Sequence, residues 1–312
     1  MVYTNARRHE FGAIRNEDDS GINDERVRFG RPDIPDLHSN GLFPVDMHFH
    51  TNHSDSPTRI KDLLGEAGRR GVGVAITDHN ACSGVIEAYQ SGSSAVVIPG
   101  IEISAADGPH ILVYFYTPAD LRDYFERHVK RRKRASPYLA TTLSTGDILD
   151  SLDGYACMKV AAHPFGYVFF NKGLVKCINN AYLPGELVQR FDGLEVICGS
   201  MNRALNIQAA NLASDLGMAT TGGSDGHMLG DLGGVVTCTE SEDAAGIIEQ
   251  IMHRDNLVMG SEKHILGKCV MGPVVLMKYV RYTAPSLRIH YEQNAPRVRR
   301  FLGIRGKKGD KR

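Results

Sequence analysis

The chain has 312 residues, of which 42% are hydrophobic, and its 36 basic side chains balance 36 acidic ones. This length and apolar content allow a buried core in one large barrel-type domain or in two ordinary domains. The neutral charge balance argues against bulk binding to nucleic acid or to an anionic membrane surface, although local basic patches remain compatible with it.

The cysteines and the apolar runs indicate a cytoplasmic protein. No apolar core segment opens the chain as in a secretory signal, and no apolar run approaches the ~18 residues of a membrane span. The cysteines are scattered and form no C-x-x-C pair, so we expect buried thiols rather than disulfides or a zinc ribbon. They are Cys82, Cys157, Cys177, Cys198, Cys238 and Cys269.

Residues 1–42 are polar and charged, and we expect them to form an N-terminal arm around the domain. From Val45 to about Gly260, short strand-like runs alternate with helical segments. Ser56 and Pro57 suggest an N-cap and first turn for a helix over Pro57–Arg70, and Thr117-Pro118 repeats that signature. Further helices are expected over "MNRALNIQAANLASDLG", which ends at Gly217, and after Ser241-Glu242-Asp243.

Alternating strands and helices predict a parallel sheet with right-handed crossovers. Seven or eight such units favour a closed β/α barrel over an open sheet. We therefore expect a barrel over 43–260, with an insertion at about 117–157, and a helical C-terminal extension with a basic tail over 261–312. The chain carries neither G-x-G-x-x-G after its first strand nor a Walker loop, so a glycine-rich nucleotide cradle is not expected.

Histidines and carboxylates gather where the predicted strands end, beginning with the stretch "VDMHFHTNHSD". In a β/α barrel the C-terminal ends of the strands converge on one mouth, which holds the site. Each motif alone has a plain reading, such as a surface histidine or a buried salt-bridge partner. The whole set makes those readings improbable together: His48, His50, Asp55, His79, Glu102, His110, His163, Asp225 and His227.

Imidazole and carboxylate ligands without thiolates suit Mn²⁺, Fe or Zn²⁺. Six histidines and three carboxylates are too many for one ion and enough for two or three. Clustered metals usually serve the hydrolysis of phosphate esters, because they activate water and neutralise phosphoryl oxygens.

The order and wording of these motifs resemble the PHP (polymerase and histidinol phosphatase) family. The resemblance covers about Val45–Gly260 and rests on "HFH…D", "TDHN", "GIEIS", His110, "AAHPFG" and "SDGH". It implies a distorted (β/α)7 barrel and a trinuclear site at which a metal-bridging hydroxide attacks a phosphate monoester. It also implies three ligand groups: His48, His50, Glu102 and Asp225; Glu102 with His110 and His163; and Asp55, His79 and His227.

The wording "TDHN" and "GIEIS" resembles members that act on nucleotides, so the expected substrate is a nucleoside monophosphate, a 3′,5′-bisphosphate or a short RNA end. We expect no stable nucleic-acid partner, and the sequence leaves the oligomeric state open. Histidinol phosphate, an amidohydrolase-like reaction and a non-catalytic accessory role stay open as alternatives.

Five residues outside the ligand set have expected roles. Arg203 and Asn80 are candidate substrate contacts, and Glu195, inside an apolar strand, is a candidate partner of a ligand. His53 and Asp78 are expected to lie outside the ligand set, in supporting or surface roles. The basic run "HVKRRKR" is either a solvated helix end or a basic lip for a phosphate.

Overall fold

The fold is described from a computed structural model, which covers residues 21–167, 172–263, 272–273 and 275–301. Its strands form one curled sheet in the order β1-β10-β9-β2-β3-β4-β5-β6-β7-β8. The strands are β1 (Val27–Phe29), β2 (Phe43–Phe49), β3 (Gly73–Ile76), β4 (Val97–Ser104), β5 (His110–Phe115), β6 (Cys157–Ala161), β7 (Gly193–Cys198), β8 (Ala219–Gly223), β9 (Val235–Thr239) and β10 (Leu257–Gly260).

The sheet is mixed, and this corrects the expectation of a wholly parallel one. β2, β3 and β4 run parallel, as do β6, β7 and β8. β5 runs antiparallel to both β4 and β6, with Ser104 opposite His110 and Ile111 opposite Ala161. β9 is also antiparallel to β2 and to β10. A five-residue connection from β4 to β5 (105–109) is long enough for a hairpin and too short for a parallel crossover.

The curled sheet closes where β2 meets the end of β8. Phe49 pairs with Gly226, the His50 N–H donates to the Gly226 carbonyl at 2.8 Å, and the Gly226 N–H donates to the His48 carbonyl at 3.1 Å. Gly223 permits this approach, because a Cβ at its position would lie 2.3 Å from the Cβ of His48. The result is a distorted barrel with mixed strand directions.

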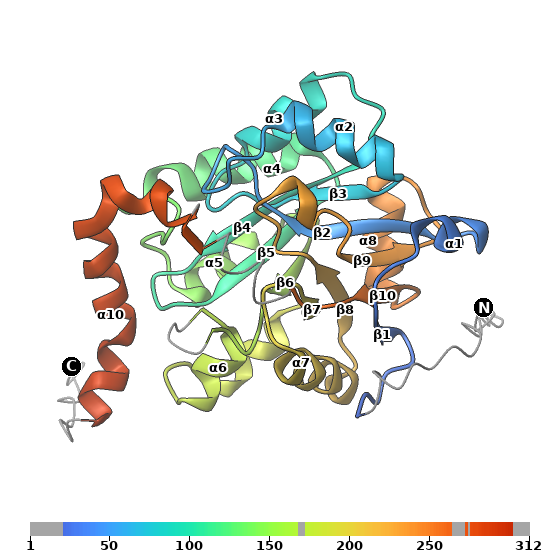
Figure 1. Cartoon of the computed structure of the whole chain (residues 1–312). Helices are drawn as coiled ribbons and strands as arrows, with labels where there is room; N and C mark the ends of the chain where they lie inside the picture. The colour runs from blue at the N-terminus through green and yellow to red at the C-terminus, as the bar shows by residue number, and fades with distance from the viewer. Residues whose placement is uncertain (1–20, 168–171, 264–271, 274, 302–312) are drawn as a thin grey trace.

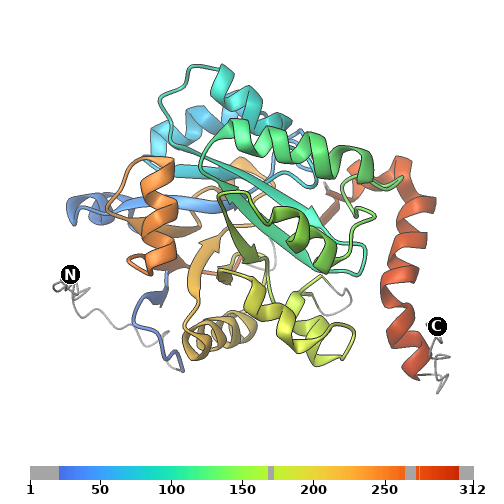
Figure 2. The same cartoon turned by 180° about the vertical axis from the view of Figure 1, so that it is seen from behind.

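Helices surround the barrel, as the two opposite views show (Figure 1; Figure 2). α2, α3 and α4 cover one side and α6 and α7 cover the other (Figure 1). The α-helices are α1 (Ile34–Ser39), α2 (Ile60–Arg70), α3 (Ser83–Gln90), α4 (Pro118–Tyr124), α5 (Thr145–Leu152), α6 (Leu174–Asn179), α7 (Arg203–Leu216), α8 (Ala244–His253) and α10 (Thr283–Phe301).

Several helix predictions are confirmed at their ends. α7 ends at Gly217, which adopts φ 63, and Thr117 caps α4 by accepting from the Asp120 N–H. The helix expected from Pro57 begins only at Ile60, with Arg59 at its N-cap position. The Ser56 hydroxyl, three residues earlier, donates to the His227 carbonyl and accepts from the Thr58 N–H. α8 is capped by Asp243 alone.

The insertion is less regular than one helix. After α4 the chain continues as the π-helix η2 (Phe125–Val129) and the 3₁₀-helix η3 (Lys130–Arg132), which contain most of the basic run. The further 3₁₀-helices are η4 (Gly185–Arg190), η5 (Leu229–Asp231) and η6 (Val280–Tyr282). The chain then returns along the rim, where the Thr141 N–H donates to the Ser104 carbonyl at 2.8 Å.

The described parts of the N-terminal arm and of the C-terminal extension pack on the barrel. In the expected N-terminal arm, β1 pairs in parallel with β10, so this part of the arm extends the sheet; residues 1–20 lie outside the described residues. In the C-terminal extension, α10 (red in Figure 1) packs Ile289 against Leu139 and Ala140 of the insertion. The basic end at 302–312 and Cys269 lie outside the described residues.

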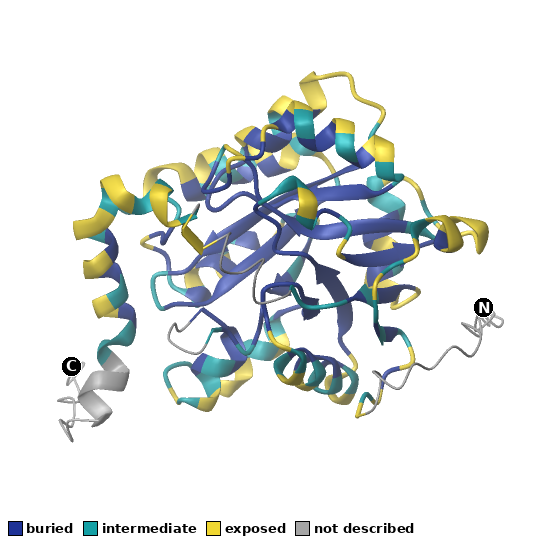
Figure 3. Cartoon of the chain, viewed as in Figure 1, coloured by how far each residue is buried: buried dark blue, intermediate teal, exposed yellow. Residues whose placement is uncertain are grey.

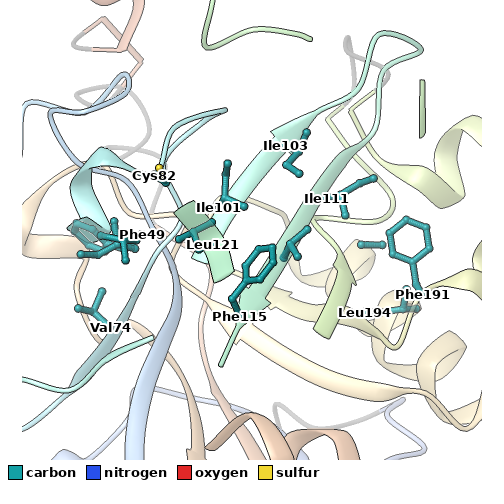
Figure 4. Packing of buried hydrophobic residues seen from close by; sticks show 14 of the residues in the cluster. Phe49, Val74, Cys82, Ile101, Ile103, Ile111, Phe115, Leu121, Phe191 and Leu194 are labelled. Carbon is teal, nitrogen blue, oxygen red and sulfur yellow. The ribbon is translucent and has the colours of Figure 1, made fainter. Parts of the chain in front are cut away.

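The core lies between the sheet and its helices, where the strands are buried almost throughout (Figure 3). Phe49, Ile101, Ile111 and Phe115 pack together with helix residues such as Leu121 (Figure 4). Within the parts of the chain that the structure describes, no helix combines the length and apolar character needed to cross a bilayer.

Candidate metal centre

The nine residues singled out in the sequence come together at one end of the barrel, and all nine are buried. His48 lies near the end of β2 and His50 follows that strand directly. Asp55 and His79 lie in the loops after β2 and β3, and Glu102 lies near the end of β4. The strand period turns the side chains of His48 and His50 to the same face, and their Nε2 atoms are 3.2 Å apart.

His110 reaches the mouth because β5 runs in the opposite direction. It stands at the start of its strand, which in a parallel barrel would place it at the far end from the other ligands. In the antiparallel hairpin the start of β5 lies beside the end of β4, so His110 Nδ1 approaches Glu102 Oε1 to 2.8 Å.

Glu102 is the centre of the cluster. Its Oε1 lies 2.8 Å from His110 Nδ1 and 3.2 Å from His163 Nε2. Its Oε2 lies 2.8 Å from His79 Nδ1 and 3.5 Å from both His48 Nε2 and His50 Nε2. One carboxylate therefore faces five imidazoles, more than any other acid of the cluster.

Two further carboxylates complete the cluster on either side. Asp225 Oδ1 lies 3.2 Å from His50 Nε2 and 3.6 Å from His48 Nε2. Asp55 Oδ1 lies 3.3 Å from His227 Nε2, and Asp55 Oδ2 lies 3.6 Å from His79 Nε2. Each carboxylate thus faces two imidazoles in the same group that the family resemblance implies.

The donor set fits divalent ions. Atoms of His50, Asp55, His79 and His227 that could hold an ion all lie within 4.8 Å of one another. Three further groups meet the same criterion: His48, His50 and Asp225; His79, Glu102 and His110; and His48, Glu195 and Cys198. Five buried atoms of the cluster lack a hydrogen-bond partner among the described residues: His50 Nδ1, Asp55 Oδ1, Glu102 Oε2, His110 Nε2 and His163 Nδ1. Because a buried polar atom without a partner is costly, these atoms favour a bound cation.

The electrostatics follow from burying acids and imidazoles together. Burial alone would lower the pKa of His79, but Glu102 and Asp55 raise it to about 9. Burial opposes ionisation of Glu102 and Asp225 as well, yet the surrounding histidines hold the pKa of both carboxyls well below the usual range. Without a bound ion, the cluster therefore holds ionised carboxylates beside protonated imidazole. A cation that binds the imidazole nitrogen would displace its proton.

Backbone conformation at the mouth is strained at ligand positions. His163 adopts φ 29, Asp225 adopts φ 48 and the neighbouring Asn80 adopts φ 50, all in the left-handed region that non-glycine residues avoid. Such strain concentrates at functional sites, where the surrounding structure enforces it.

Glu195 is the partner of two candidate ligands, as its place in an apolar strand suggested. Its Oε1 lies 2.9 Å from His48 Nδ1, and its Oε2 accepts from the His163 N–H at 2.6 Å. When neutral His48 carries its proton on Nδ1 and donates it to Glu195, the lone pair of Nε2 is left to bind an ion. Nε2 is the nitrogen that faces Glu102 and Asp225.

The other expected residues lie around the cluster. Arg203 stacks on Phe29 at 4.1 Å and pairs with Glu262, and Asn80 donates to the Pro137 carbonyl. Their roles as substrate contacts stay predictions.

The two residues set apart from the ligands have separate environments. His53 contacts Ser83 and Glu87 away from the cluster, whereas Asp78 is buried and accepts from the Thr51 N–H and from the Thr51 and Ser54 hydroxyls. Asp78 thereby fixes the loop that carries Asp55.

Sequence reasoning missed three supporting side chains. The Tyr167 hydroxyl donates to Asp225 Oδ2 at 2.7 Å, the Ser200 hydroxyl donates to the same oxygen, and the Tyr279 hydroxyl donates to Asp55 Oδ2 at 3.0 Å. Tyr167 follows "AAHPFG" closely, so its proximity to the motif was a usable signal. Tyr279 lies 224 residues from its partner, and nothing in the local pattern marks it.

Three solved structures are reported as similar in fold. A protein from Bifidobacterium adolescentis, described as a candidate metal-dependent phosphoesterase, has a TM-score of 0.50 and 20% identity, covering 72% of this chain and 98% of that one. The lesion-specific endonuclease PfuEndoQ from Pyrococcus furiosus has a TM-score of 0.54 and 16% identity, covering 70% of this chain and 57% of the other.

The third is a two-domain protein from Bacteroides vulgatus with a predicted PHP-like metal-dependent phosphoesterase (TM-score 0.51, 17% identity, 80% of this chain and 70% of that one). No curated protein matches the sequence. The PHP domain model matches residues 46–252, the segment that carries all nine clustered residues. The chain therefore belongs to the PHP family.

Proposed function

We propose that this protein hydrolyses a phosphate monoester of a nucleotide at a site for three divalent metal ions. By its family the chain is a hydrolase of the metal-dependent phosphoesterase class. The substrate class is a nucleoside monophosphate, a nucleoside 3′,5′-bisphosphate or a short RNA end, and Mn²⁺, Fe and Zn²⁺ are the candidate ions.

One observation carries the proposal: six buried imidazoles and three buried carboxylates face one another at the mouth. A structural role would pair each acid with one base and leave few polar atoms unsatisfied. Here five ligand atoms lack hydrogen-bond partners among the residues described, and Glu102 faces five imidazoles. This arrangement supports cation binding rather than a set of salt bridges.

The proposed ligand groups keep the division given by the family resemblance. His48, His50, Glu102 and Asp225 form the first group, Glu102, His110 and His163 the second, and Asp55, His79 and His227 the third. When bound, the metals would activate water and neutralise the charge on the phosphate. The protein's own part is to hold these side chains, through Glu195, Tyr167 and Asp78, and to exclude bulk water from a buried cluster.

The test is a metal-loaded protein assayed against a panel of esters. We expect turnover of nucleotide monoesters with Mn²⁺, and lower rates on sugar phosphates and histidinol phosphate. Asp225→Asn should lose metal and activity together, because it removes the charge that faces His48 and His50. Asp255→Asn, an exposed aspartate beyond α8, is the matched control. Full activity in Asp225→Asn would contradict the assigned site, and turnover of amides alone would exclude the phosphoesterase assignment.

A further inference from the structure

The C-terminal extension reaches the metal centre, although it lies outside the segment matched by the PHP model. Tyr279, in the helical segment before η6, places its hydroxyl 3.0 Å from Asp55 Oδ2. The Tyr279 phenol supplies the hydrogen of this contact, because an ionised carboxylate can only accept. The contact therefore joins the extension to a proposed ligand.

The two oxygens of Asp55 have different surroundings. Oδ2 accepts from Tyr279 and lies 3.6 Å from His79 Nε2, whereas Oδ1 is buried, lies 3.3 Å from His227 Nε2, and makes no hydrogen bond to any residue that the structure describes. A hydrogen bond to one oxygen of a carboxylate fixes its rotation and leaves the other oxygen to the ion. Tyr279 thus fixes the Asp55 carboxylate with Oδ1 toward His227 and Oδ2 toward His79, the orientation in which Oδ1 is left for a cation held with these two histidines.

The extension holds Tyr279 in place through specific packing. The Tyr279 ring meets Tyr138 of the insertion edge-on, with centroids 6.4 Å apart and planes at 89°. The Tyr138 segment is fixed to the mouth, because Asn80 donates to the Pro137 carbonyl and the Ser104 hydroxyl donates to the Tyr138 carbonyl.

α10 adds further anchors to this docking. Its Ile289 is 1% exposed, its Ser286 hydroxyl bonds to Ser136, and its Gln293 amide donates to the Ala105 carbonyl. Ser136 belongs to the insertion and Ala105 follows β4. The extension is therefore joined to both elements beside the cluster, which keeps Tyr279 over Asp55.

We propose that Tyr279 is a positioning residue for Asp55, and that the docked C-terminal extension thereby raises the affinity of the metal site formed by Asp55, His79 and His227. The inference rests on the metal centre proposed above. It assigns a direct part in metal occupancy to the extension, which donates to a proposed ligand from outside the matched PHP segment. Tyr279 acts through Asp55, so its effect falls on one of the three ligand groups and leaves the groups around Glu102 and Asp225 unchanged.

Tyr279→Phe tests this with the full chain, because it removes one oxygen and keeps the ring against Tyr138. Tyr291→Phe is the matched control, since Tyr291 lies on α10 and is 70% exposed. Mn²⁺ binding is followed by equilibrium dialysis with metal analysis and by the electron paramagnetic resonance signal of free Mn²⁺. We expect one class of site in Tyr279→Phe to bind roughly 10-fold more weakly while the rest are unchanged.

The activity arm separates this inference from the proposed function. Tyr279→Phe should regain wild-type kcat at high Mn²⁺, with the Mn²⁺ concentration for half activity shifted by the same factor, whereas Tyr291→Phe should match wild type in both measurements. Equal Mn²⁺ affinity in Tyr279→Phe and wild type would overturn the inference. If even wild type hydrolyses no phosphate ester, the proposed function fails, and the binding measurement still decides the role of Tyr279.

Discussion

Glu195→Gln is the most informative single substitution in the cluster, because it preserves shape and removes one charge. The Glu195 carboxylate faces two donors, His48 Nδ1 at 2.9 Å and the His163 N–H at 2.6 Å. A glutamine offers one acceptor oxygen and one NH₂ group. The NH₂ group must therefore face one of these two donors, so that no hydrogen bond forms there. The alternative is that His48 carries its proton on Nε2 and accepts from the glutamine through Nδ1.

The magnitude follows from those two contacts. A buried donor without an acceptor costs about 1–3 kcal/mol, and loss of the partner of a ligand histidine typically lowers metal affinity about 10–100-fold. Moving the proton to Nε2 would place it on the nitrogen that faces Glu102 and Asp225, where it would compete with the ion. We therefore expect Glu195→Gln to bind Mn²⁺ about 10–100-fold more weakly.

The assay is a metal titration of the purified full chain, with urea unfolding of the metal-free form measured in parallel. Glu249→Gln makes the same carboxylate-to-amide replacement at an exposed position on α8, away from the cluster, and serves as the control. Metal affinity in Glu195→Gln that equals that of wild type and of the control would refute the reasoning, because it would mean that His48 needs no carboxylate to present Nε2. A variant that fails to fold without metal would be compared by metal-dependent thermal stabilisation instead.

Three further outcomes are expected. His79 has a pKa of about 9 in the cluster without metal, so at neutral pH it holds a proton that a metal must displace. The affinity for Mn²⁺ should therefore fall about 10-fold per pH unit for each displaced proton as the pH drops from 9 to 6. Calorimetry in buffers of different protonation enthalpy measures the number of protons released. Gly223→Ala should lower the free energy of unfolding by about 1–3 kcal/mol or more in urea, because the new Cβ would meet His48 at 2.3 Å; wild-type stability would contradict the closure described for β2 and β8. Asp78→Asn should lower it by about 1–3 kcal/mol and loosen the loop of Asp55, since three donors converge on that carboxylate, and unchanged proteolysis of the loop would count against this.

The sequence predicted which side chains gather at the mouth of the barrel better than it predicted the strand directions. His48, His50 and Glu102 were readable because polar residues inside apolar strands are costly without a partner. The direction of β5 was not readable, because a short apolar run has the same composition in a parallel and an antiparallel strand. The clue lay in the loop: five residues between β4 and β5 leave no room for a crossover helix.

The predicted helix starts were not equally accurate. Thr117 caps α4 as expected, but the Ser56 hydroxyl donates to the His227 carbonyl, a partner 171 residues away. Glu195 could be suspected from its burial, whereas Tyr279 could not be found at all. Contacts between residues so far apart in the sequence depend on how the whole chain packs, and no local sequence pattern predicts them.

Because β5 is antiparallel to its neighbours, the two ends of the insertion lie far from its middle segment. β5 ends at Phe115 and β6 begins at Cys157, so the segment between them leaves and rejoins the sheet at the edge opposite the cluster. Its middle segment nevertheless reaches the rim of the barrel beside the cluster. There the Pro137 carbonyl accepts from the Asn80 side chain, and the Thr141 N–H donates to the Ser104 carbonyl. A change in the length of the insertion would therefore leave the strands that carry the clustered residues uninterrupted, whereas a change at Pro137 or Thr141 would alter the rim beside the cluster.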